Sequence, residues 1–504
     1  MNLTNLYNSV NLIQPEIAIT ITLLLIVVVD LIFKENKKLI PYIAIIGSVV
    51  GAILVIAQFN ATGFAFGLSE NANPNFGMVA VDKFGSFFKL LVILTTIVIV
   101  LFSLSSDEIK KIYPRTGEYY ALVFGMLLGM MFLIGATDLV LIYLSLELLS
   151  LSSYVLAGFT KLRDRNSEAA LKYLIFGAVS SGFMIFGISI YYGLTGETNL
   201  YLINPMLQNP NVNILTLSFA TLLIIAGIGY KISSVPFHFW TPDVYEGAPI
   251  TITTYLSVAS KAAGFALLIR FIRAGFVAFV QENGHWTLNS SFDWVFLIAL
   301  LSILTMTLGN LTALWQDNLK RMLAYSSVAH AGYLLLGVVA LSNQGVLGVF
   351  VYFAFYAITN LAAFYIVMLI ANKIGSENID DYRGLGHTSP LLGVSFTIIL
   401  ISLVGLPPTA GFIGKLYLFF AILDKNMLVL ATIAILNTVV SLYYYIRVVK
   451  HMFLYKPNEE TPSIRLSVGP KTLLSVLTMG VLYFGVYPSQ VIDFAQDCLQ
   501  FLGF

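Results

Sequence analysis

Long apolar runs separated by short polar segments fill this sequence, and they constrain its fold more than any other feature. A helix needs about 20 mainly apolar residues to cross a membrane. Fourteen runs approach or exceed that length, near residues 17–33, 40–58, 86–104, 119–136, 139–159, 171–193, 213–240, 248–272, 294–312, 324–341, 346–371, 391–424, 428–453 and 472–496. We therefore expect an all-α, polytopic membrane protein of about fourteen transmembrane helices. Prolines inside the seventh and twelfth runs predict that these two helices are broken.

The composition excludes several classes of protein. Hydrophobic residues make up 58% of the 504 residues and charged residues 11%, whereas a soluble domain carries roughly 25% charged residues. A net charge of +1 gives no indication of a nucleic-acid partner. Cys498 is the only cysteine, which excludes an internal disulfide, a cysteine zinc site and an iron–sulfur cluster bound by this chain. The sequence contains no phosphate-binding GxxxxGK[ST] loop, so we expect no ATP site.

Basic residues are distributed unevenly between the loops. If alternate loops are assigned to the cytoplasm, beginning with the first, that side receives seventeen lysines and arginines. The other side receives only Lys83, Lys89, Arg270, Arg273 and Lys425. Because short cytoplasmic loops are enriched in Lys and Arg, the bias predicts that both termini lie on the non-cytoplasmic face. The first residues lack the features of a cleavable signal, so we expect the first apolar run to be retained.

Several ionisable residues fall inside the apolar runs. The clearest are Glu147, Lys231, Lys261 and Lys415. A charge at the centre of a bilayer costs roughly 2.5–3.5 kcal/mol on insertion scales. Charges at this cost mark an ion or proton pathway by default.

Lys231 lies five residues before Pro236, in the stretch "LLIIAGIGYKISSVPFHFW". A proline frees backbone carbonyls, and these need water or polar neighbours because lipid provides none. A hydrated pocket beside Lys231, with Glu147 as a mobile counter-charge, would let the lysine load and release a proton. The alternative is a structural ion pair between two helices.

Lys261 and Lys415 extend the predicted pathway. Lys261 is surrounded by small residues in "SVASKAAGF", which leave room for water and suit a relay group. The alternative for Lys261 is a side chain that snorkels to the interface. Lys415 follows the proline pair of "GLPPTAGF", where it suits the last group of a second half-channel. The alternative for Lys415 is a lysine at the end of a re-entrant loop.

Weaker candidates complete the set. Lys172 lies about one turn into its run, so snorkelling competes with a role in the pathway. His330 is a possible link, because a histidine ordinarily titrates near neutral pH, although a buried histidine is often only hydrogen-bonded. We expect Arg447 to anchor a basic span end, and Asp243 and Glu246 to cap loops.

The two interrupted runs, one in each half of the chain, suggest two inverted repeats. On this basis the chain divides into three N-terminal helices over 1–116, a first half-channel repeat over 117–280, a second over 281–456, and a C-terminal helix over 457–504.

The segment "GIGYKISSVPFHFWTPDVYEGAPITITTYLSVASKAAGF" resembles the antiporter-like membrane subunits of respiratory complex I, a family that includes cation/proton antiporter subunits and membrane-bound hydrogenase components. The resemblance extends over essentially the whole chain, including "GLPPTAGFIGKLYLF" around Lys415. The N-type branch of bacterial NADH:quinone oxidoreductase is most similar, because "SEAALKYLIFGAVSSG" resembles its sixth span. A lysine at position 415 and the absence of a long lateral helix also favour this branch over the M and L types.

The resemblance implies a proton-translocating subunit that performs no redox chemistry itself. It assigns Glu147 and Lys231 to a switching pair, Lys261 to a central relay and Lys415 to the exit side. Through "DNLKRMLAYSSVAHAGY" it also gives Lys320, Tyr325 and His330 a place near the path. No cofactor is expected in this chain; NADH, FMN, iron–sulfur clusters and quinone belong to partner subunits in a bacterial inner membrane. The alternatives are a subunit of a cation/proton antiporter and a non-pumping membrane scaffold.

Overall fold

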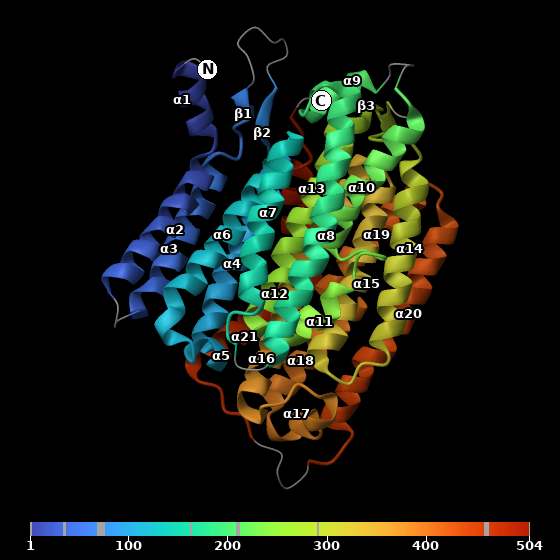
Figure 1. The fold of residues 1–504 in the computed structure, drawn as a ribbon. Coiled ribbons are helices and arrows are strands. Elements are labelled where there is room, and N and C mark those ends of the chain that lie inside the picture. Colours follow the sequence, from blue (N-terminus) through green and yellow to red (C-terminus); the bar gives the residue numbers. More distant parts are fainter. Residues whose placement is uncertain are drawn as a thin grey trace.

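Helices make up most of the molecule and form one elongated bundle (Figure 1). The structure is a computed structural model that describes residues 3–33, 37–67, 76–161, 164–207, 212–289, 292–457 and 463–502. Two of the basic loop residues used to predict the orientation, Lys34 and Arg163, lie outside the described residues. The N-terminal part consists of α1 (Leu3–Leu12), α2 (Gln14–Ile32), α3 (Ile40–Ala57), β1 (Gly63–Gly67), β2 (Gly77–Val81), α4 (Lys83–Ser105) and α5 (Asp107–Lys110).

The central part of the chain contains most of the remaining helices. Its first section consists of α6 (Thr116–Gly135), α7 (Leu139–Ala157), α8 (Asp164–Thr195), α9 (Leu200–Met206), α10 (Ile214–Ile232), α11 (Trp240–Gly247), α12 (Ile250–Tyr255), α13 (Lys261–Phe276), β3 (Val277–Val280) and β4 (Trp286–Leu288). Its second section consists of α14 (Trp294–Ala313), α15 (Leu319–Val339), α16 (Asn343–Ile374), α17 (Leu385–Thr388), α18 (Pro390–Val404), α19 (Ala410–Asp424) and α20 (Leu428–Phe453). The chain ends with α21 (Val468–Val486) and α22 (Ser489–Asp497). Strands β1 and β2, and likewise β3 and β4, form antiparallel hairpins.

The predicted membrane spans are confirmed. Thirteen helices of the described residues are long and apolar enough to cross a membrane, and a bent helix pair ending in α18 raises the number to fourteen. The twelfth apolar run consists of α18 and α19, with an interruption between them. The eighth run is one continuous helix from Ile250 to Phe276, although a π-helical turn over Leu256–Ser260 lies inside it. Both ends of the described chain lie at the same end of the bundle, opposite α5 and α17 (Figure 1).

The helices differ in how much of their surface other helices cover. All of α13, nearly all of α15 and most of α16 are buried, so these three helices form the centre of the bundle. Helices α2, α3 and α8 expose large apolar side chains such as Leu24, Ile53 and Phe186. Because lipid replaces water around a membrane protein, exposed apolar side chains are expected on the outer helices. Charged residues in the middle of these spans, such as Lys261 on α13, are therefore remote from lipid.

Two stretches of the central part repeat the same arrangement. Asp138 and Asn318 begin α7 and α15, and each forms an isolated antiparallel bridge, with Asn199 and Asn378 respectively. The next residue donates its N–H to a carbonyl in the same way: Leu139 to Thr198 and Leu319 to Glu377, both at 2.8 Å. Helices α8 and α16, which follow α7 and α15, each contain 32 residues.

The helix breaks repeat as well. Ser233 directly follows α10 and Gly405 directly follows α18, and both residues have the left-handed conformation, with φ of 62° and 88°. A proline after a cis peptide bond follows each, Pro236 and Pro408. Each repeat contains five spans, an odd number, so the second copy crosses the membrane in the opposite direction. The chain thus contains two inverted-repeat halves.

Candidate functional site

Lys231 is buried in the last turn of α10, directly before the helix break. Its side chain is only 1% exposed. The ammonium donates to the Ser150 hydroxyl on α7 at 3.2 Å and lies 3.5 Å from the Tyr173 hydroxyl on α8. The break contributes to the packing here, because Trp240 from α11 stacks on the Tyr173 ring. The lysine is therefore held by neutral hydroxyl groups from two neighbouring helices.

Glu147 lies one helical turn before Ser150 on α7 and is partly exposed. Its Oε1 atom is buried and has no hydrogen-bond partner among the described residues. Within the same described residues, Glu147 and Lys231 do not form an ion pair, and Ser150 takes the place that a carboxylate would occupy beside the ammonium. An unpaired buried carboxylate oxygen is costly unless it finds a partner. The geometry leaves Glu147 close to Lys231 in the helix bundle but not bonded to it.

Lys261 follows the π-helical turn on the eighth span and is 1% exposed. Its ammonium donates two hydrogen bonds of 2.7 Å to Ser327 on α15, one to the carbonyl and one to the hydroxyl. The Ser327 hydroxyl also accepts a hydrogen bond of 2.9 Å from Tyr356 on α16. A π turn places one extra residue in the helix, and such turns occur frequently at functional sites. Lys261 is thus connected to α15 and α16 rather than to the first repeat.

His330 lies on the same face of α15, one turn after Ser327. Its Nδ1 atom is hydrogen-bonded to the Tyr352 hydroxyl, and its Nε2 atom lies 3.2 Å from the Tyr445 hydroxyl on α20. The His330 ring centre is 5.0 Å from that of Tyr356. Both ring nitrogens therefore have hydroxyl partners, and a tyrosine connects the surroundings of His330 to Lys261.

Lys415 lies beyond the second helix break, on α19, and is 4% exposed. Its ammonium donates to the carbonyl of Val404, the last residue of α18, at 2.7 Å. That carbonyl is one of the groups that the break frees, and the C-terminal end of a helix attracts positive charge. Lys415, His330, Tyr352 and Tyr356 all line one small cavity.

Together these contacts form a polar path through the apolar centre. Hydrogen bonds join Lys261 to Ser327 and Ser327 to Tyr356, whose ring packs against His330; Tyr356, His330 and Lys415 all line the small cavity. Lys231 lies on the adjoining helix: a Cβ atom at Gly264 on α13 would lie 3.8 Å from the Lys231 Cβ. The sequence-predicted groups Lys261, His330 and Lys415 are brought together, and Lys231 and Glu147 lie beside them in the first repeat.

Counting from the start of each repeat shows which residues occupy equivalent positions in the two halves. Glu147 lies nine residues after Asp138, and Ser327 nine residues after Asn318, so the two occupy the same place in α7 and α15. By the same count Ser150, the partner of Lys231, corresponds to His330. The tenth residue is Tyr173 in α8 and Tyr352 in α16. The lysines differ, because Lys231 precedes its break whereas Lys415 follows its own.

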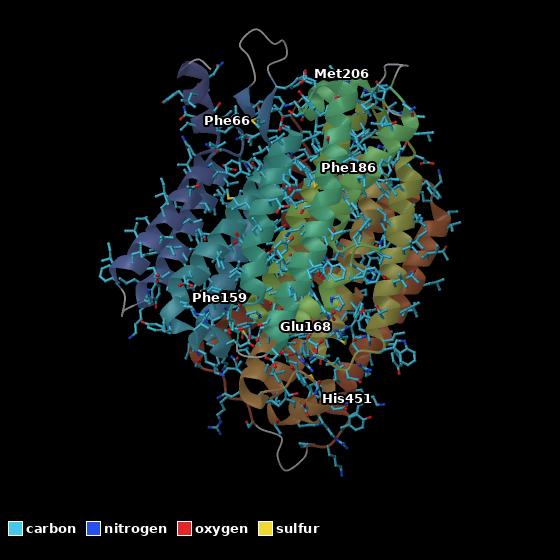
Figure 2. The ribbon with its side chains drawn as sticks, in the orientation of Figure 1. Phe66, Phe159, Glu168, Phe186, Met206 and His451 are labelled. Carbon is cyan, nitrogen blue, oxygen red and sulfur yellow. The ribbon has the colours of Figure 1, made fainter. Side chains whose placement is uncertain are left out.

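Glu168 lies in the half of the bundle remote from the termini (Figure 2), and the partly exposed Lys172 pairs with it. Its ammonium pairs with Glu168 at 2.8 Å and with Asp243 at 2.7 Å. Asp243 and Glu246 also pair with Arg321 on α15, at 2.6 and 3.0 Å. We expected these two acids to cap loops; instead they lie within α11 and hold it between α8 and α15, because the break turns α11 toward both helices. Arg447 donates to the carbonyls of Leu314 and Gln316, as an anchor would.

Two buried ion pairs were not predicted. Asp82 and Arg270 are both fully buried, and their bidentate contacts measure 2.8 Å each. Glu16 and Lys89 pair at 2.6 Å between α2 and α4. Each partner lies near the end of an apolar run, where the sequence gives no sign that the side chain turns inward. Among the described residues, no group of three or more His, Cys, Asp and Glu side chains is arranged to hold a metal ion.

Comparison with known proteins gives consistent matches. Residues 136–441 match the family described as "NADH:quinone oxidoreductase/Mrp antiporter, TM". The chain is 46% identical over 495 residues to NADH-quinone oxidoreductase subunit N 2 of Chloroherpeton thalassium, with 97% of this chain and 94% of that protein covered. It is 44% identical to NADH-quinone oxidoreductase subunit N of Chlorobium chlorochromatii, with 98% and 96% covered.

Solved structures match over similar lengths. A chain of respiratory complex I from Thermus thermophilus is 28% identical, with a TM-score of 0.76 over 95% of this chain and 98% of that one. A chain of the Mrp complex from Dietzia sp. is 18% identical, with a TM-score of 0.82 and 97% of both chains covered. The second likeness concerns the fold alone.

Proposed function

The chain belongs to the NADH:quinone oxidoreductase/Mrp antiporter transmembrane family, and we propose that it translocates protons as a membrane-arm subunit of an NADH:quinone oxidoreductase. The resemblance to the N-type branch is confirmed by relatives of that name at 44–46% identity over nearly the whole chain. The subunit performs no redox chemistry; electron transfer in partner subunits drives the proton movement.

One observation supports this function best: three lysines that are buried in the centre of the bundle face hydroxyl and carbonyl partners rather than carboxylates. Their contacts are Lys231 to Ser150, Lys261 to Ser327, and Lys415 to Val404. A lysine that only stabilised helix packing would be expected to pair with an acid, as Lys89 does with Glu16. Neutral partners hold an ammonium only weakly, and therefore allow it to give up its proton.

In this proposal each group has a separate task. Lys231 takes up a proton when Glu147 approaches and releases it when Glu147 withdraws, because an opposite charge stabilises the ammonium form. Lys261 receives the proton and passes it by way of Ser327, Tyr356 and His330, whose hydroxyl and ring groups both donate and accept hydrogen bonds. Lys415 releases it on the far side. Lys172 belongs to the entrance of this proton path, where it forms ion pairs with Asp243 and Glu168.

The same proposal assigns the redox cofactors to partner subunits and gives the chain an orientation in the membrane. NADH, FMN, iron–sulfur clusters and quinone are bound by partner subunits, and further antiporter-like subunits adjoin this one in the bacterial inner membrane. Both termini lie on the non-cytoplasmic side. The bundle end opposite the termini carries Lys110, Arg165 and Arg321, which is the asymmetry expected of a cytoplasmic face. The half-channels occupy residues 117–280 and 281–456, after the three helices of 1–116 and before the C-terminal helix of 457–504.

The test is Lys231→Ala in the complete complex, reconstituted into vesicles. We expect NADH-driven acidification to fall to a small fraction of the wild-type rate, with the complex still assembled. The matched control is Lys111→Ala, which removes an exposed lysine at the bundle end and should leave acidification unchanged. Wild-type acidification by the Lys231 variant would refute the proposal and favour a membrane scaffold whose buried charges only fix helix positions.

A second candidate is cation/proton antiport, since the chain has the fold of an Mrp complex subunit. The two functions differ in their driving force. An antiporter subunit moves protons in vesicles when a sodium gradient is imposed without NADH, whereas the proposed subunit requires NADH oxidation. The subunits that co-purify in mild detergent distinguish them as well: flavin and iron–sulfur proteins favour the oxidoreductase.

A further inference from the structure

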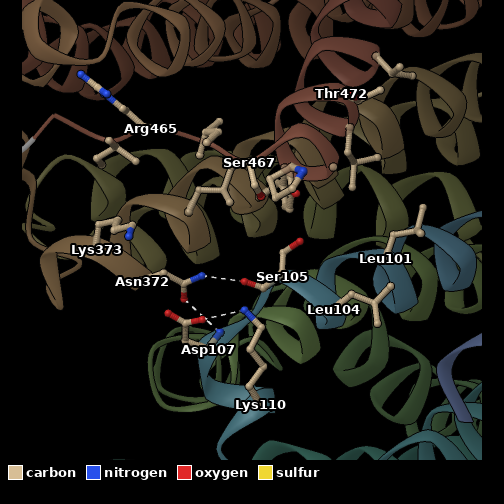
Figure 3. A pocket seen from close by; sticks show the side chains of 18 residues that line it. Leu101, Leu104, Ser105, Asp107, Lys110, Asn372, Lys373, Arg465, Ser467 and Thr472 are labelled. Carbon is tan, nitrogen blue, oxygen red and sulfur yellow. Dashed lines mark hydrogen bonds and ion pairs between the residues drawn. The ribbon is translucent and has the colours of Figure 1, made fainter. Parts of the chain in front are cut away.

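A large cavity lies at the bundle end opposite the termini, outside the lysine path. It measures about 930 Å³ and lies where α4 and α16 end and where α21 begins (Figure 3). These three segments are far apart in the sequence and together line the cavity, which is open to one side. None of the groups in the proposed proton path lines it.

The lining of the cavity changes from apolar to basic along the helix axes. Leu101 and Leu369 lie one turn or more inside the ends of α4 and α16, and Val476 lies two turns into α21. Lys110, Lys373 and Arg465 lie at or beyond the helix ends. Because spans end at the surface of a membrane, the apolar lining lies at the depth of acyl chains and the basic lining at the depth of headgroups.

The basic residues leave a positive charge in the cavity. Asp107 is the one acid among the described lining residues, and it already pairs with Lys110 at 3.0 Å. Asn372 lies next to this ion pair, and its amide donates to the Ser105 carbonyl at 2.9 Å (Figure 3). Lys373 and Arg465 are exposed, and the described residues provide neither of them with a carboxylate partner. The cavity therefore attracts an anion.

An apolar strip continues from the cavity along α21. Val476, Met479 and Tyr483 occupy one face of this helix at helical spacing, and they are 62%, 63% and 46% exposed. A soluble anion would use the basic rim but would gain nothing from this strip. A lipid would use both, with its headgroup at Lys373 and Arg465 and an acyl chain along α21.

We propose that this cavity binds an anionic phospholipid, with the phosphate held by Lys373 and Arg465 and one acyl chain lying along α21. Arginine and lysine clusters between transmembrane helices are suited to phosphate headgroups, by charge and by hydrogen-bond geometry. The bound lipid links the end of the N-terminal helix group, through α4, to the second repeat, through α16, and to the last span.

The test uses the assembled complex in mild detergent and a photoactivatable phosphatidylglycerol. We expect the label on peptides from residues 464–476 and 365–373, competed by unlabelled phosphatidylglycerol and not by phosphatidylcholine. The double variant Lys373→Gln/Arg465→Gln should bind about 25-fold more weakly, since each basic residue contributes roughly fivefold at a membrane surface. The matched control, Lys111→Gln/Lys456→Gln, removes two exposed lysines outside the lining and should bind as the wild type does.

A second variant tests the cavity without changing its charge. A Cβ at Gly469 would meet no heavy atom of the described residues within 4 Å, so Gly469→Trp should fill the space and block labelling without disturbing the helix. Equal labelling of the wild type, the double variant and Gly469→Trp would overturn the proposal. Competition by glycerol 3-phosphate as strong as that by the lipid would also overturn it, because it would indicate a soluble-anion site. Cross-linking of this cavity to a neighbouring subunit in place of lipid would do the same.

Discussion

Ser327 offers the sharpest test of the proton path, because the repeat places it where the first half has Glu147. Ser327→Ala removes the hydroxyl that accepts from Lys261 at 2.7 Å and from Tyr356 at 2.9 Å, and leaves the carbonyl contact of Lys261 intact. A hydrogen bond to a charged group contributes about 1.5–3 kcal/mol. That loss corresponds to roughly a 10- to 150-fold smaller population of the protonated lysine at this position.

The assay is NADH-driven acidification in vesicles with the reconstituted complex, alongside NADH oxidation by the same preparation. We expect acidification by Ser327→Ala to fall by at least tenfold. Ser302→Ala is the matched control, since Ser302 is equally buried and loses one hydrogen bond of 2.7 Å, to Gly332 on α15, away from any lysine. If both variants acidify the vesicles at the wild-type rate, Ser327 is not part of the path and the correspondence with Glu147 has no functional meaning.

Three further outcomes follow from the structure. Glu147→Gln should lower coupled turnover while the complex assembles normally, because Oε1 makes no hydrogen bond among the described residues; unchanged acidification by this variant would contradict the switching role. Asp82→Asn should destabilise the fold by about 3–5 kcal/mol, since it leaves the buried Arg270 charge uncompensated; a thermal scan of the purified complex would detect this, and an unchanged unfolding temperature would count against it. Burial alone would raise the pKa of the Asp82 carboxyl, but Arg270 holds it below its usual value; the pair therefore stabilises the fold above about pH 4, and this stability should disappear as the pH falls through the folded-state pKa in wild type but not in Asp82→Asn.

The spans and their interruptions could be predicted because they depend on local properties of the chain. An apolar run of the required length has few alternatives in a membrane, and a proline inside it disturbs the helix wherever the run is placed. Thus the twelfth run was expected to be broken and does separate into α18 and α19. The sequence could not show that Pro236 and Pro408 correspond while Lys231 and Lys415 do not, since this requires the backbone contacts around each break.

The partners of the buried charges depend on packing between distant segments. Glu147 and Ser150 lie one turn apart on the same helix, so the sequence alone could not decide which of them holds Lys231. Arg270 was counted among the basic residues near a span end; in the structure it is buried against Asp82, almost two hundred residues earlier in the chain. A buried ion pair of this kind has no local signature, because each partner resembles an ordinary residue of a loop or helix terminus.

The π-helical turn over Leu256–Ser260 has a mechanical consequence for the residue that follows it. One residue of an α-helix corresponds to about 100° of rotation and about 1.5 Å of rise. If the π turn moved along the span to the far side of Lys261, the lysine would rotate around the helix axis by about that angle, away from α15, while both ends of the span stayed fixed. The eighth span thus contains one residue more than a regular helix of the same length needs, and this surplus lies directly before Lys261.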